Sequence, residues 1–437
     1  MSRLPYVFAG LLLASCTALP SPATGPSALP PTSQITALQE QYRVDEIQNR
    51  EFTHSELWSA IGPIIDESGN LEREEIGQSG EGRPLYSVRF GDGPTRVLLW
   101  SQMHGDESTA TMALADIFNF FAESPDHPLV EQLADELTIV AVPMLNPDGA
   151  QRFQRRNAYG VDVNRDARML STPEARALKA LHDSFDPDFG FNLHDQNIRT
   201  RVGSTDRQAA ISLLAPAIDS EGTYNDVRNR ARKVAAVIRN SIEPLVGGHI
   251  TQYDATFNPR AFGDLVQSWG TSTVLIESGG WADDPEKQYL RQVNFVAILS
   301  ALDAIATGSY AAADPERYNS LPMNGRSASD LLVTGGTVVI PGLAPIPLDI
   351  SVNFENPLER RGGEIDDIGD LQAVTARQTL DITGLFVHPT SDALEYSAQG
   401  DASLQPGAPA SFTVRRGVDP NSEVVWVVED GRVRRGN

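Results

Sequence analysis

A histidine and a glutamate lie three residues apart in this chain, at His104 and Glu107, and two further candidate site residues follow at His194 and Glu277. Histidine nitrogens and carboxylate oxygens are ligands of catalytic zinc, which takes three ligands from the protein and keeps one position open for water. His104 and Glu107 can reach one ion if a strand ends at the histidine and a helix begins near the glutamate. His194 would then supply the third ligand. By itself this spacing is a weak indication of a metal, because glutamates are common at helix starts and most histidines pair with other groups.

A polar segment between these candidates carries more information. It comprises Asn-Pro-Asp-Gly at residues 146–149 and Arg-Arg-Asn-Ala-Tyr-Gly-Val-Asp-Val-Asn-Arg-Asp at residues 155–166. Together with the His-x-x-Glu pair, the later histidine and the final glutamate, this segment resembles the zinc carboxypeptidase family, the carboxypeptidase A-like metallopeptidases. All five features occur in the family's order between residues 104 and 277, and the resemblance extends over about residues 50–308.

The resemblance assigns a role to each matched residue. His104, Glu107 and His194 are expected to hold one zinc ion. Arg155 matches the arginine that polarises the scissile carbonyl and stabilises the oxyanion, because a fixed cation aimed at developing charge lowers the barrier. Arg156 takes this role instead if the register is shifted by one residue.

The resemblance also implies how the substrate is bound and cleaved. Asn164 and Arg165 match the pair that binds the terminal carboxylate, for which the planar fork of arginine is suited. Glu277 matches the general base that takes a proton from the attacking water and passes it to the leaving amine. Without the family context, Arg165 with Asp166 is interpreted as a surface ion pair, and Glu277 as a strand-end carboxylate in a salt bridge.

Several positions depart from the family's pattern. Residues 105–106 are Gly-Asp, where digestive members carry an arginine, and this resembles bacterial members that act on cell-wall peptides or acylated amino acids. Tyr253 is a candidate for the tyrosine that caps the substrate, but its spacing differs. The pocket for the last side chain is expected near residues 259–267, where Asp264 could favour a basic residue, cap a helix or be solvated. Asp195 could orient a metal ligand by a hydrogen bond.

These residues need a scaffold that brings distant segments to one edge. From about residue 34 to 310, strand-like apolar runs alternate with helical patterns, which predicts an α/β fold: a mixed, mostly parallel sheet with helices on both faces. The candidate site residues follow strand ends, where ligands bind in such sheets. The expected strands are 85–90, 97–101, 137–143, 189–193 and 273–277, and the expected helices are 107–121, 172–185, 224–242 and 286–305.

The sequence changes character after about residue 321. Short alternating runs separated by Pro and Gly turns predict an all-β accessory domain of sandwich type over residues 321–437. This segment could bind sugar, cell wall or a partner, or pack against the catalytic domain and stabilise it. Its expected strands are 331–333, 337–340, 348–354, 380–386, 412–415 and 424–428.

The N-terminal residues predict export. Arg3 precedes an apolar run, residues 6–14, that is too short to span a bilayer, so residues 1–15 are expected to be a signal peptide. The sequence Leu-Ala-Ser-Cys ending at Cys16 resembles a bacterial lipobox, in which the cysteine is lipidated, and an ordinary secretory signal is the alternative. Residues 16–35 are then expected to be a lipidated tether, followed by a catalytic domain at 36–310. Thr17, in place of aspartate, favours an outer-membrane anchor on the periplasmic side.

Composition limits the classes of partner. The chain has 437 residues with 35 Lys plus Arg and 58 Asp plus Glu, a net charge of −23, which argues against nucleic acid as the main partner. Its single cysteine excludes an intramolecular disulfide. The predicted function is a zinc metallocarboxypeptidase that acts outside the cytoplasm on peptides with a free C-terminal carboxylate. The alternatives are an amidase or carboxypeptidase on peptidoglycan stem peptides and a non-catalytic module that binds carboxylates.

Overall fold

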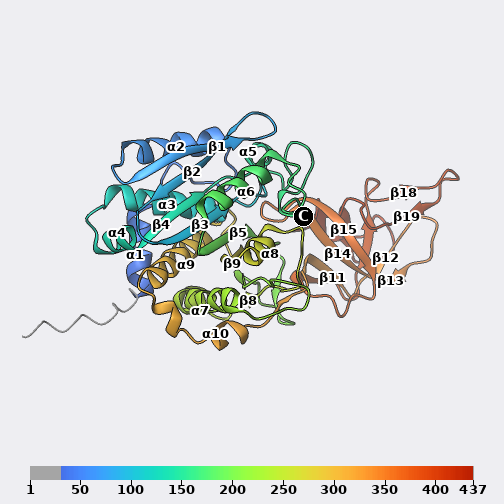
Figure 1. The fold of residues 1–437 in the computed structure, drawn as a ribbon. Coiled ribbons are helices and arrows are strands. Elements are labelled where there is room, and N and C mark those ends of the chain that lie inside the picture. The colour runs from blue at the N-terminus through green and yellow to red at the C-terminus, as the bar shows by residue number, and fades with distance from the viewer. Residues whose placement is uncertain (1–30, 437) are drawn as a thin grey trace, which may run out of the picture.

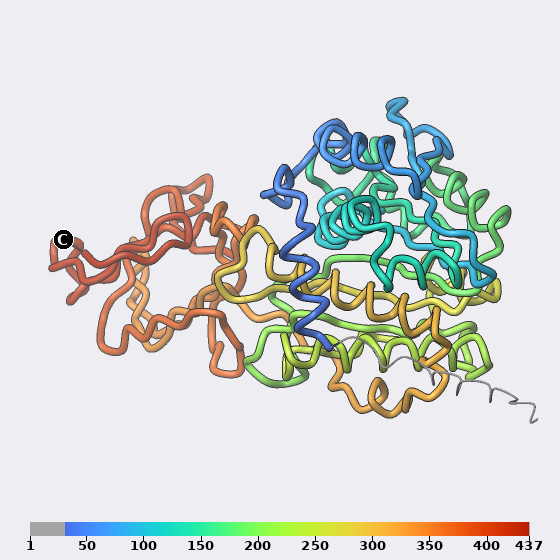
Figure 2. The backbone as a smooth tube through the Cα atoms, turned by 90° about the vertical axis from the view of Figure 1, so that its left-hand side faces the viewer, coloured from blue at the N-terminus to red at the C-terminus, as the bar shows by residue number. Residues whose placement is uncertain are grey.

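The computed structural model of the chain describes residues 31–436. The signal peptide expected at residues 1–15 and the lipidation site at Cys16 lie outside the described residues. Figure 1 shows an α/β lobe built around a central sheet and, at one side of it, a β-rich lobe formed by the C-terminal part of the chain. Figure 2 shows the same two lobes side by side after a quarter turn.

The centre of the α/β lobe is an eight-stranded sheet with the strand order β1-β2-β4-β3-β5-β9-β7-β8. Four strand pairs are parallel, β3–β4, β3–β5, β5–β9 and β7–β8, and three are antiparallel, β1–β2, β2–β4 and β7–β9. The predicted mixed sheet is therefore confirmed. The strands are β1 (Leu71–Gln78), β2 (Pro84–Phe90), β3 (Thr95–Ser101), β4 (Leu137–Val142), β5 (Phe189–Asp195), β7 (Ile211–Leu214), β8 (Ile250–Gln252) and β9 (Ser272–Ser278).

Helices cover both faces of this sheet. Successive residues of a strand point to opposite faces, so Val97 and Leu99 of β3 join one apolar core while Leu98 and Trp100 join another. The first core includes α1 (Thr32–Tyr42), α2 (His54–Glu67), α3 (Thr109–Glu123), α4 (Pro128–Glu136), α7 (Asp226–Val246) and α9 (Gln288–Ala306). The second core includes α6 (Pro173–Phe185) and α8 (Phe262–Ser268).

Helix α9 passes through the middle of the first core. Among the described residues it is the one helix long and apolar enough to cross a membrane, but 83% of its apolar window is buried inside the protein. Its composition is therefore that of a core helix, which is apolar all round because other elements surround it.

Local signals explain where several elements begin. Helix α6 starts with Pro173 at its first position, and the side chain of Thr172 accepts a hydrogen bond from the backbone N–H of Ala175. All six residues of β4 are buried, as expected for an apolar strand covered on both faces. The predicted helices and strands of this lobe are found within a few residues of their expected bounds, but the sequence did not predict α1, α2, α4, α8, β1, β7 and β8.

Two expectations about the chain's organisation need correction. The tether was expected to extend to residue 35, but residues 32–35 begin α1, and Ile35 is buried in the core because the helix packs its apolar side there. The run 380–386 was expected to be one strand. It instead spans a turn between β16 (Ala376–Asp381) and β17 (Phe386–Pro389), in which the backbone N–H of Leu385 donates to the carbonyl of Ile382.

The C-terminal lobe consists mainly of two sheets that share one apolar core. One sheet has the order β15-β14-β11-β16 and the other β13-β12-β17-β20-β21-β22. Val352 and Ile365 from the first sheet pack with Phe412 and Val414 from the second, which is the arrangement of a sandwich. The strands are β11 (Ser329–Thr334), β12 (Thr337–Val338), β13 (Ile346–Pro347), β14 (Asp349–Asn356), β15 (Arg361–Gly369), β16 (Ala376–Asp381), β17 (Phe386–Pro389), β20 (Phe412–Arg415), β21 (Val424–Glu429) and β22 (Arg432–Arg435), with a separate hairpin of β18 (Glu395–Tyr396) and β19 (Ala402–Ser403).

Short elements complete the fold and connect the lobes. Strand β6 (Arg201–Val202), which follows β5, pairs with β10 (Asn324–Gly325) just before the C-terminal lobe. The remaining elements are α5 (Pro147–Ala150), η1 (Val163–Arg165), η2 (Ser309–Ala312) and α10 (Glu316–Asn319).

Candidate metal centre

Three parallel strands at the centre of the sheet bring the candidate residues together. In β5 and β9, His194 lies directly opposite Glu277. His104 follows the end of neighbouring β3 by three residues, and Glu107 lies two residues before α3 begins. The site therefore forms at the carboxyl edge of the sheet, where the sequence placed it.

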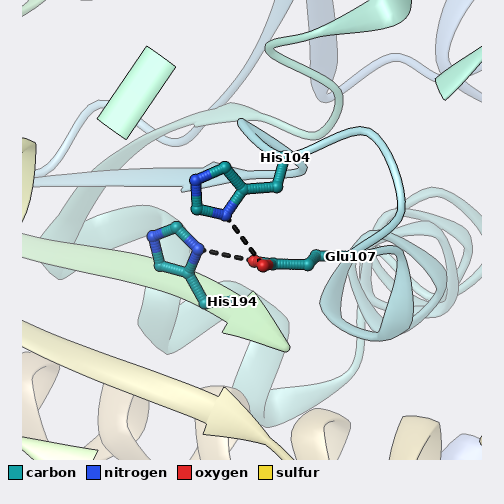
Figure 3. Close-up of side chains that lie close together, drawn as sticks. All are labelled: His104, Glu107 and His194. Atoms are coloured by element: carbon teal, nitrogen blue, oxygen red, sulfur yellow. Dashed lines mark hydrogen bonds and ion pairs between the residues drawn. The ribbon is translucent and has the colours of Figure 1, made fainter. Parts of the chain in front are cut away.

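His104, Glu107 and His194 form a buried cluster, shown in Figure 3. The Nδ1 atom of His104 lies 2.8 Å from Oε1 of Glu107, and Nδ1 of His194 lies 2.7 Å from Oε2 of the same carboxylate. The three potential ligand atoms lie within 4.8 Å of one another, and no other such group of three or more occurs among the described residues. Two imidazole nitrogens and a carboxylate converging on one point fit the ligand set of a catalytic zinc ion.

A hydrogen bond from a residue outside the predicted ligand set orients His104. Oδ1 of Asp162 lies 2.9 Å from Nε2 of this ring, which leaves Nδ1 to face the cluster. Burial acts to lower the pKa of His104, but the charge of Glu107 and the bond to Asp162 outweigh it and raise the pKa to about 9. The sequence interpretation had assigned no role to Asp162, although it lies in the polar segment two residues before Asn164.

Arg155 reaches the cluster, and Arg156 does not. Nη1 of Arg155 donates to Oε1 of Glu107 at 3.1 Å, and its Nε and Nη2 donate to Asp162 at 3.1 and 2.9 Å. Arg156 points instead to the carbonyl of Gly160, 3.0 Å away, and is exposed. Of the two registers left open by the sequence, the geometry therefore favours the one with Arg155 at the site.

Glu277 lies beside the cluster in a different environment. It is buried, and among the described residues no cation or hydrogen-bond donor pairs with its carboxylate. Burial raises the pKa of Glu277 well above its ordinary value, and the charge of Glu107 adds to the effect. The strand-end salt bridge considered as an alternative is not formed, and a carboxylate with raised proton affinity is available to the cavity.

Comparison with known proteins gives the same family. A family model described as zinc carboxypeptidase matches residues 65–208, a range that contains every candidate ligand and Arg155. The chain contains a zinc carboxypeptidase domain. Glu277 lies beyond the matched range, and strand β9 brings it to the site.

Individual relatives cover limited parts of the chain. Carboxypeptidase SOL1 of Arabidopsis thaliana is 27% identical over 28% of this chain and 26% of its own length. Carboxypeptidase D of Mus musculus is 31% identical over 24% of this chain and 9% of its own length. The chain thus spans about a quarter or less of the length of these curated relatives.

Two solved structures are similar to part of this chain. A metallo-carboxypeptidase from Burkholderia cenocepacia gives a TM-score of 0.47 at 16% identity, over 59% of this chain and 70% of that one. Bovine thrombin-activatable fibrinolysis inhibitor gives a TM-score of 0.48 at 16% identity, over 60% of this chain and 98% of that one.

A cavity of about 530 Å³ in the zinc carboxypeptidase domain opens from the metal cluster. Asn164 and Arg165 line it together with Glu277. Asn164 accepts a hydrogen bond from the backbone N–H of Phe262 at 2.9 Å, and its Nδ2 lies 3.2 Å from Nε2 of His194. Arg165 donates to the carbonyl of Asn164 at 2.7 Å, which leaves part of its guanidinium free for a ligand in the cavity.

Tyr253, the candidate for the tyrosine that caps the substrate, lines the same cavity. The charge of Glu277, burial and the charge of Glu107 raise the pKa of its phenol to about 12, so it is a neutral hydrogen-bond donor near neutral pH. Its spacing in the sequence gave no clear signal, because the segment before α8 has no regular secondary structure that would fix its position.

The floor of the cavity is polar. Asp264 lies there and accepts a hydrogen bond from the backbone N–H of Asn258 at 3.0 Å, and burial raises its pKa to about 6. Both side-chain polar atoms of Asn192 are buried without a partner among the described residues. A Cβ atom added at the adjacent Gly263 would lie 2.9 Å from the Asn192 amide, so a larger residue there would require this amide to shift.

Asp195 contacts the cluster in a way that differs from the expectation. Its side chain accepts from Thr109 at 2.7 Å and Lys287 at 2.9 Å, and no contact with a ligand ring is formed. Its backbone N–H donates to Oε2 of Glu107 at 3.1 Å. Asp195 therefore positions the carboxylate through the main chain, because its side chain is held by the buried lysine.

Proposed function

We propose that the protein is a metallocarboxypeptidase that hydrolyses the C-terminal peptide bond of peptides. The observation that carries this proposal is the unpaired, buried Glu277 beside the His-Glu-His cluster, in one cavity with Asn164 and Arg165. This hydrolysis needs a general base, a set of ligands for one metal ion and a pair of residues that binds a carboxylate.

Each residue has a role that its environment supports. A zinc ion held by His104, Glu107 and His194 would polarise the scissile carbonyl and make water nucleophilic near neutral pH. Glu277 takes a proton from the attacking water, because its raised pKa gives it a higher proton affinity than an exposed glutamate has. It then delivers the proton to the leaving amine, which must be protonated before it departs.

Polar and charged side chains of the cavity bind the substrate on either side of the scissile bond. Asn164 and Arg165 bind the terminal carboxylate, since charge-assisted bonds from a guanidinium suit two carboxylate oxygens. Arg155 stabilises negative charge that develops on the carbonyl oxygen, because its Nη1 already faces the cluster. Tyr253 donates to the peptide from the cavity wall.

A paired-substrate assay tests the function. We expect hydrolysis of an acylated dipeptide with a free C-terminal carboxylate and no hydrolysis of its C-terminal amide, because the amide cannot pair with Arg165. A chelator should abolish the activity, and added zinc should restore it. Equal hydrolysis of both substrates, or activity that survives complete metal removal, contradicts the proposal.

Peptidoglycan stem peptides are a second candidate substrate, favoured by the polar cavity floor. Asn192 offers a free donor and acceptor, and Asp264 offers a carboxylate, so the floor suits a last side chain that ends in charged or polar groups. Separate digestion of ordinary peptides and murein peptides, read by mass spectrometry, distinguishes the two classes. The third alternative, a module that only binds carboxylates, predicts binding without turnover of either substrate.

We also propose that the protein is anchored in a bacterial cell envelope through Cys16. The position of its single cysteine, directly after Leu-Ala-Ser, supports lipidation at this residue. The catalytic domain at 36–310 and the accessory domain at 321–437 then lie on the periplasmic side of the outer membrane. Incorporation of a labelled fatty acid, and its loss together with membrane association in Cys16→Ser, is the expected result. Membrane association that persists in this variant contradicts the anchor.

A further inference from the structure

We propose that the C-terminal β lobe forms one wall of the substrate groove, and that this groove binds an extended, unbranched peptide main chain upstream of the scissile bond. This inference rests on the proposed function. It gives the β lobe a part in substrate selection, beyond packing against the catalytic domain.

A second cavity adjoins the His-Glu-His cluster. It has a volume of about 620 Å³, and Glu107, Arg155 and residues 195–197 line both this cavity and the one that holds Asn164 and Arg165. If the terminal residue of a peptide occupies the first cavity, its scissile bond lies at the cluster. The preceding residues then enter the second cavity.

A third cavity extends this path. It has a volume of about 340 Å³ and shares Arg50, Glu51, Asn356 and Leu358 with the second cavity. The three cavities therefore adjoin one another in a row. The first would hold the terminal residue of the peptide, the second lies beside the His-Glu-His cluster, and the third continues beyond the second.

The β lobe supplies one side of this path. The end of β14 and the turn that follows it contribute residues 355–358, and Arg361 follows at the start of β15. Asn356 fixes the turn, because its side chain accepts from the backbone N–H groups of Leu358 and Glu359, each at 3.2 Å. Arg50 of the α/β lobe lines the same cavity, with its guanidinium 4.7 Å from the ring centre of Phe153.

A contact from the loop that follows His194 holds this turn in position. Five residues after His194, Arg199 donates to Asp330 of the β lobe through Nε at 2.9 Å and Nη2 at 2.6 Å. The same Nη2 donates to the carbonyl of Phe354, immediately before the turn, at 2.6 Å. The side chain of Asp330 is only 2% exposed, so this contact is shielded from solvent. The turn cannot leave the groove without breaking these bonds.

The groove lining suits a peptide main chain. Both amide atoms of Gln196 are buried without a partner among the described residues, and Gln196 lines both the first and second cavities. An amide side chain offers an acceptor and donors, the same groups that an extended main chain presents. Cations and anions both line the second cavity, so its charge does not select one sign of side chain. The cations are Arg50, Arg152, Arg155, Arg199, Lys287 and Arg361, and the anions are Glu51, Asp106, Glu107, Asp195 and Glu355.

The experiment compares three substrates that end in the same two residues: an acylated dipeptide, a linear hexapeptide, and a hexapeptide branched at its third residue from the C-terminus. The test variant replaces residues 357–360 by Asn-Gly, a two-residue turn that suits antiparallel strands. A second variant, Leu358→Trp, narrows the groove without shortening the turn. The control shortens the β18–β19 turn at residues 398–400, which line none of the three cavities.

We expect the wild-type protein to prefer the linear hexapeptide over the dipeptide. In both variants the ratio of kcat/KM for the hexapeptide to kcat/KM for the dipeptide should fall about tenfold, as for the loss of one or two hydrogen-bonded contacts. Only the shortened turn should raise kcat/KM for the branched peptide, and the control should match the wild type on all three substrates.

Three results overturn the inference, and a fourth overturns the proposed function instead. Unchanged ratios in both folded variants show that the β lobe does not bind the upstream chain. A control that changes the ratios as much as the shortened turn shows an indirect effect on folding. If wild-type protein with zinc bound cleaves none of the substrates, the proposed function itself is wrong, whereas dipeptide cleavage without any dependence on length rejects the groove alone.

Discussion

Two glutamates in one cavity, Glu107 and Glu277, have opposite environments. Burial acts to raise the pKa of Glu107, but the two neighbouring histidines outweigh it and hold the pKa well below its ordinary value. Glu277 has no such partner, and burial together with the charge of Glu107 raises its pKa. Residues of one type can therefore serve as ligand and as base, because their neighbours separate their proton affinities.

Replacing the base should remove turnover and retain the metal. We expect Glu277→Gln to lower kcat by about 10²–10⁴-fold, the range that a positioned general base contributes. Glutamine keeps the shape of the side chain and removes an unpaired buried charge, so the melting temperature should not fall. Zinc content by mass spectrometry and kcat on an acylated dipeptide are the measurements. Undiminished hydrolysis by this variant would reject Glu277 as the base.

Asp162 should determine how tightly the metal is held. Asp162→Asn weakens the hydrogen bond that orients His104, so we expect metal affinity to fall about 10- to 100-fold, as for other groups that orient ligating histidines. Competition with a chromogenic chelator measures this change. The control is Asp183→Asn, which removes an exposed carboxylate paired with Lys179 away from the cavity. Equal affinities in the two variants contradict the role of Asp162.

Asp264 should make stability depend on pH. Its folded-state pKa of about 6 lies above the ordinary value of 3.8, so the folded protein binds this proton more tightly than the unfolded chain does. The stabilisation from this group is complete below 3.8 and is lost as the pH rises through 6. Asp264→Asn does not titrate and keeps an acceptor for Asn258. Relative to wild type, the variant should therefore gain about 2–3 kcal/mol of unfolding free energy between pH 4 and pH 8. A constant difference in urea unfolding across this range contradicts the prediction.

Among the secondary-structure elements, the sequence best predicts the strands in which nearly every residue is buried. Strands β4, β5 and β9 were predictable because nearly every residue in them is buried and apolar runs mark them. Strand β1 was missed because only Leu71 of its eight residues is buried, so no apolar pattern identifies it. Its place at the edge of the sheet allows this polar composition.

The metal ligands were predictable from motif and strand ends, but their supporting contacts were not. The approach of Asp162 to His104 joins residues 58 positions apart, and the loop that places Tyr253 has no periodic pattern. Such contacts depend on how separate elements pack, which short-range patterns do not encode. The extension of α1 into the expected tether has the same cause, since packing against α3 and α9 orders those residues.

Helix α9 is joined to α3 and to the N-terminal segment by a buried ion pair. Arg291 and Asp116 are both fully buried, and Nε of Arg291 donates to Oδ2 of Asp116 at 2.8 Å. Arg291 also donates to the carbonyls of Val44 and Ile47, at 3.0 and 2.6 Å. One side chain thus satisfies acceptors from two other segments.

Removing this arginine should destabilise the α/β lobe strongly. Arg291→Met leaves the buried carboxylate without its cation and removes a donor from two carbonyls, so we expect a loss of about 3–5 kcal/mol in urea unfolding. The matched control is Arg96→Met, which removes an exposed pair with Asp186 and should change stability by less than about 1 kcal/mol. Similar losses in the two variants contradict the importance of the buried pair.

The sequence predicts the β-rich C-terminal lobe but not where this lobe packs against the α/β lobe. The pattern of short strands and turns is local, whereas the contact between Arg199 and Asp330 joins residues 131 positions apart. This contact joins the C-terminal lobe to the loop that follows His194, and we expect it to couple the unfolding of the two lobes.

Loss of the contact between Arg199 and Asp330 should let the two lobes unfold independently. Asp330 accepts hydrogen bonds from Arg199, from the backbone N–H of Phe354 at 2.9 Å and from Arg377 at 3.3 Å. Asp330→Ala therefore removes the carboxylate that accepts from donors in both lobes. We expect the single calorimetric transition of the wild type to split into two, and protease cleavage between the lobes, near residues 320–328, to accelerate. The expected loss is about 3–5 kcal/mol, because a shielded arginine is left without its carboxylate.

The control for this prediction lies in the same lobe. Glu423→Ala removes an exposed pair with Arg416 and should leave both the calorimetric profile and the cleavage rate within error of the wild type. If Asp330→Ala also unfolds in one transition at the wild-type temperature, the Arg199–Asp330 contact does not couple the lobes. A split transition would instead show that the wall of the substrate groove is held in place by the loop that follows His194, so the stability of the β lobe and the shape of the groove depend on one contact.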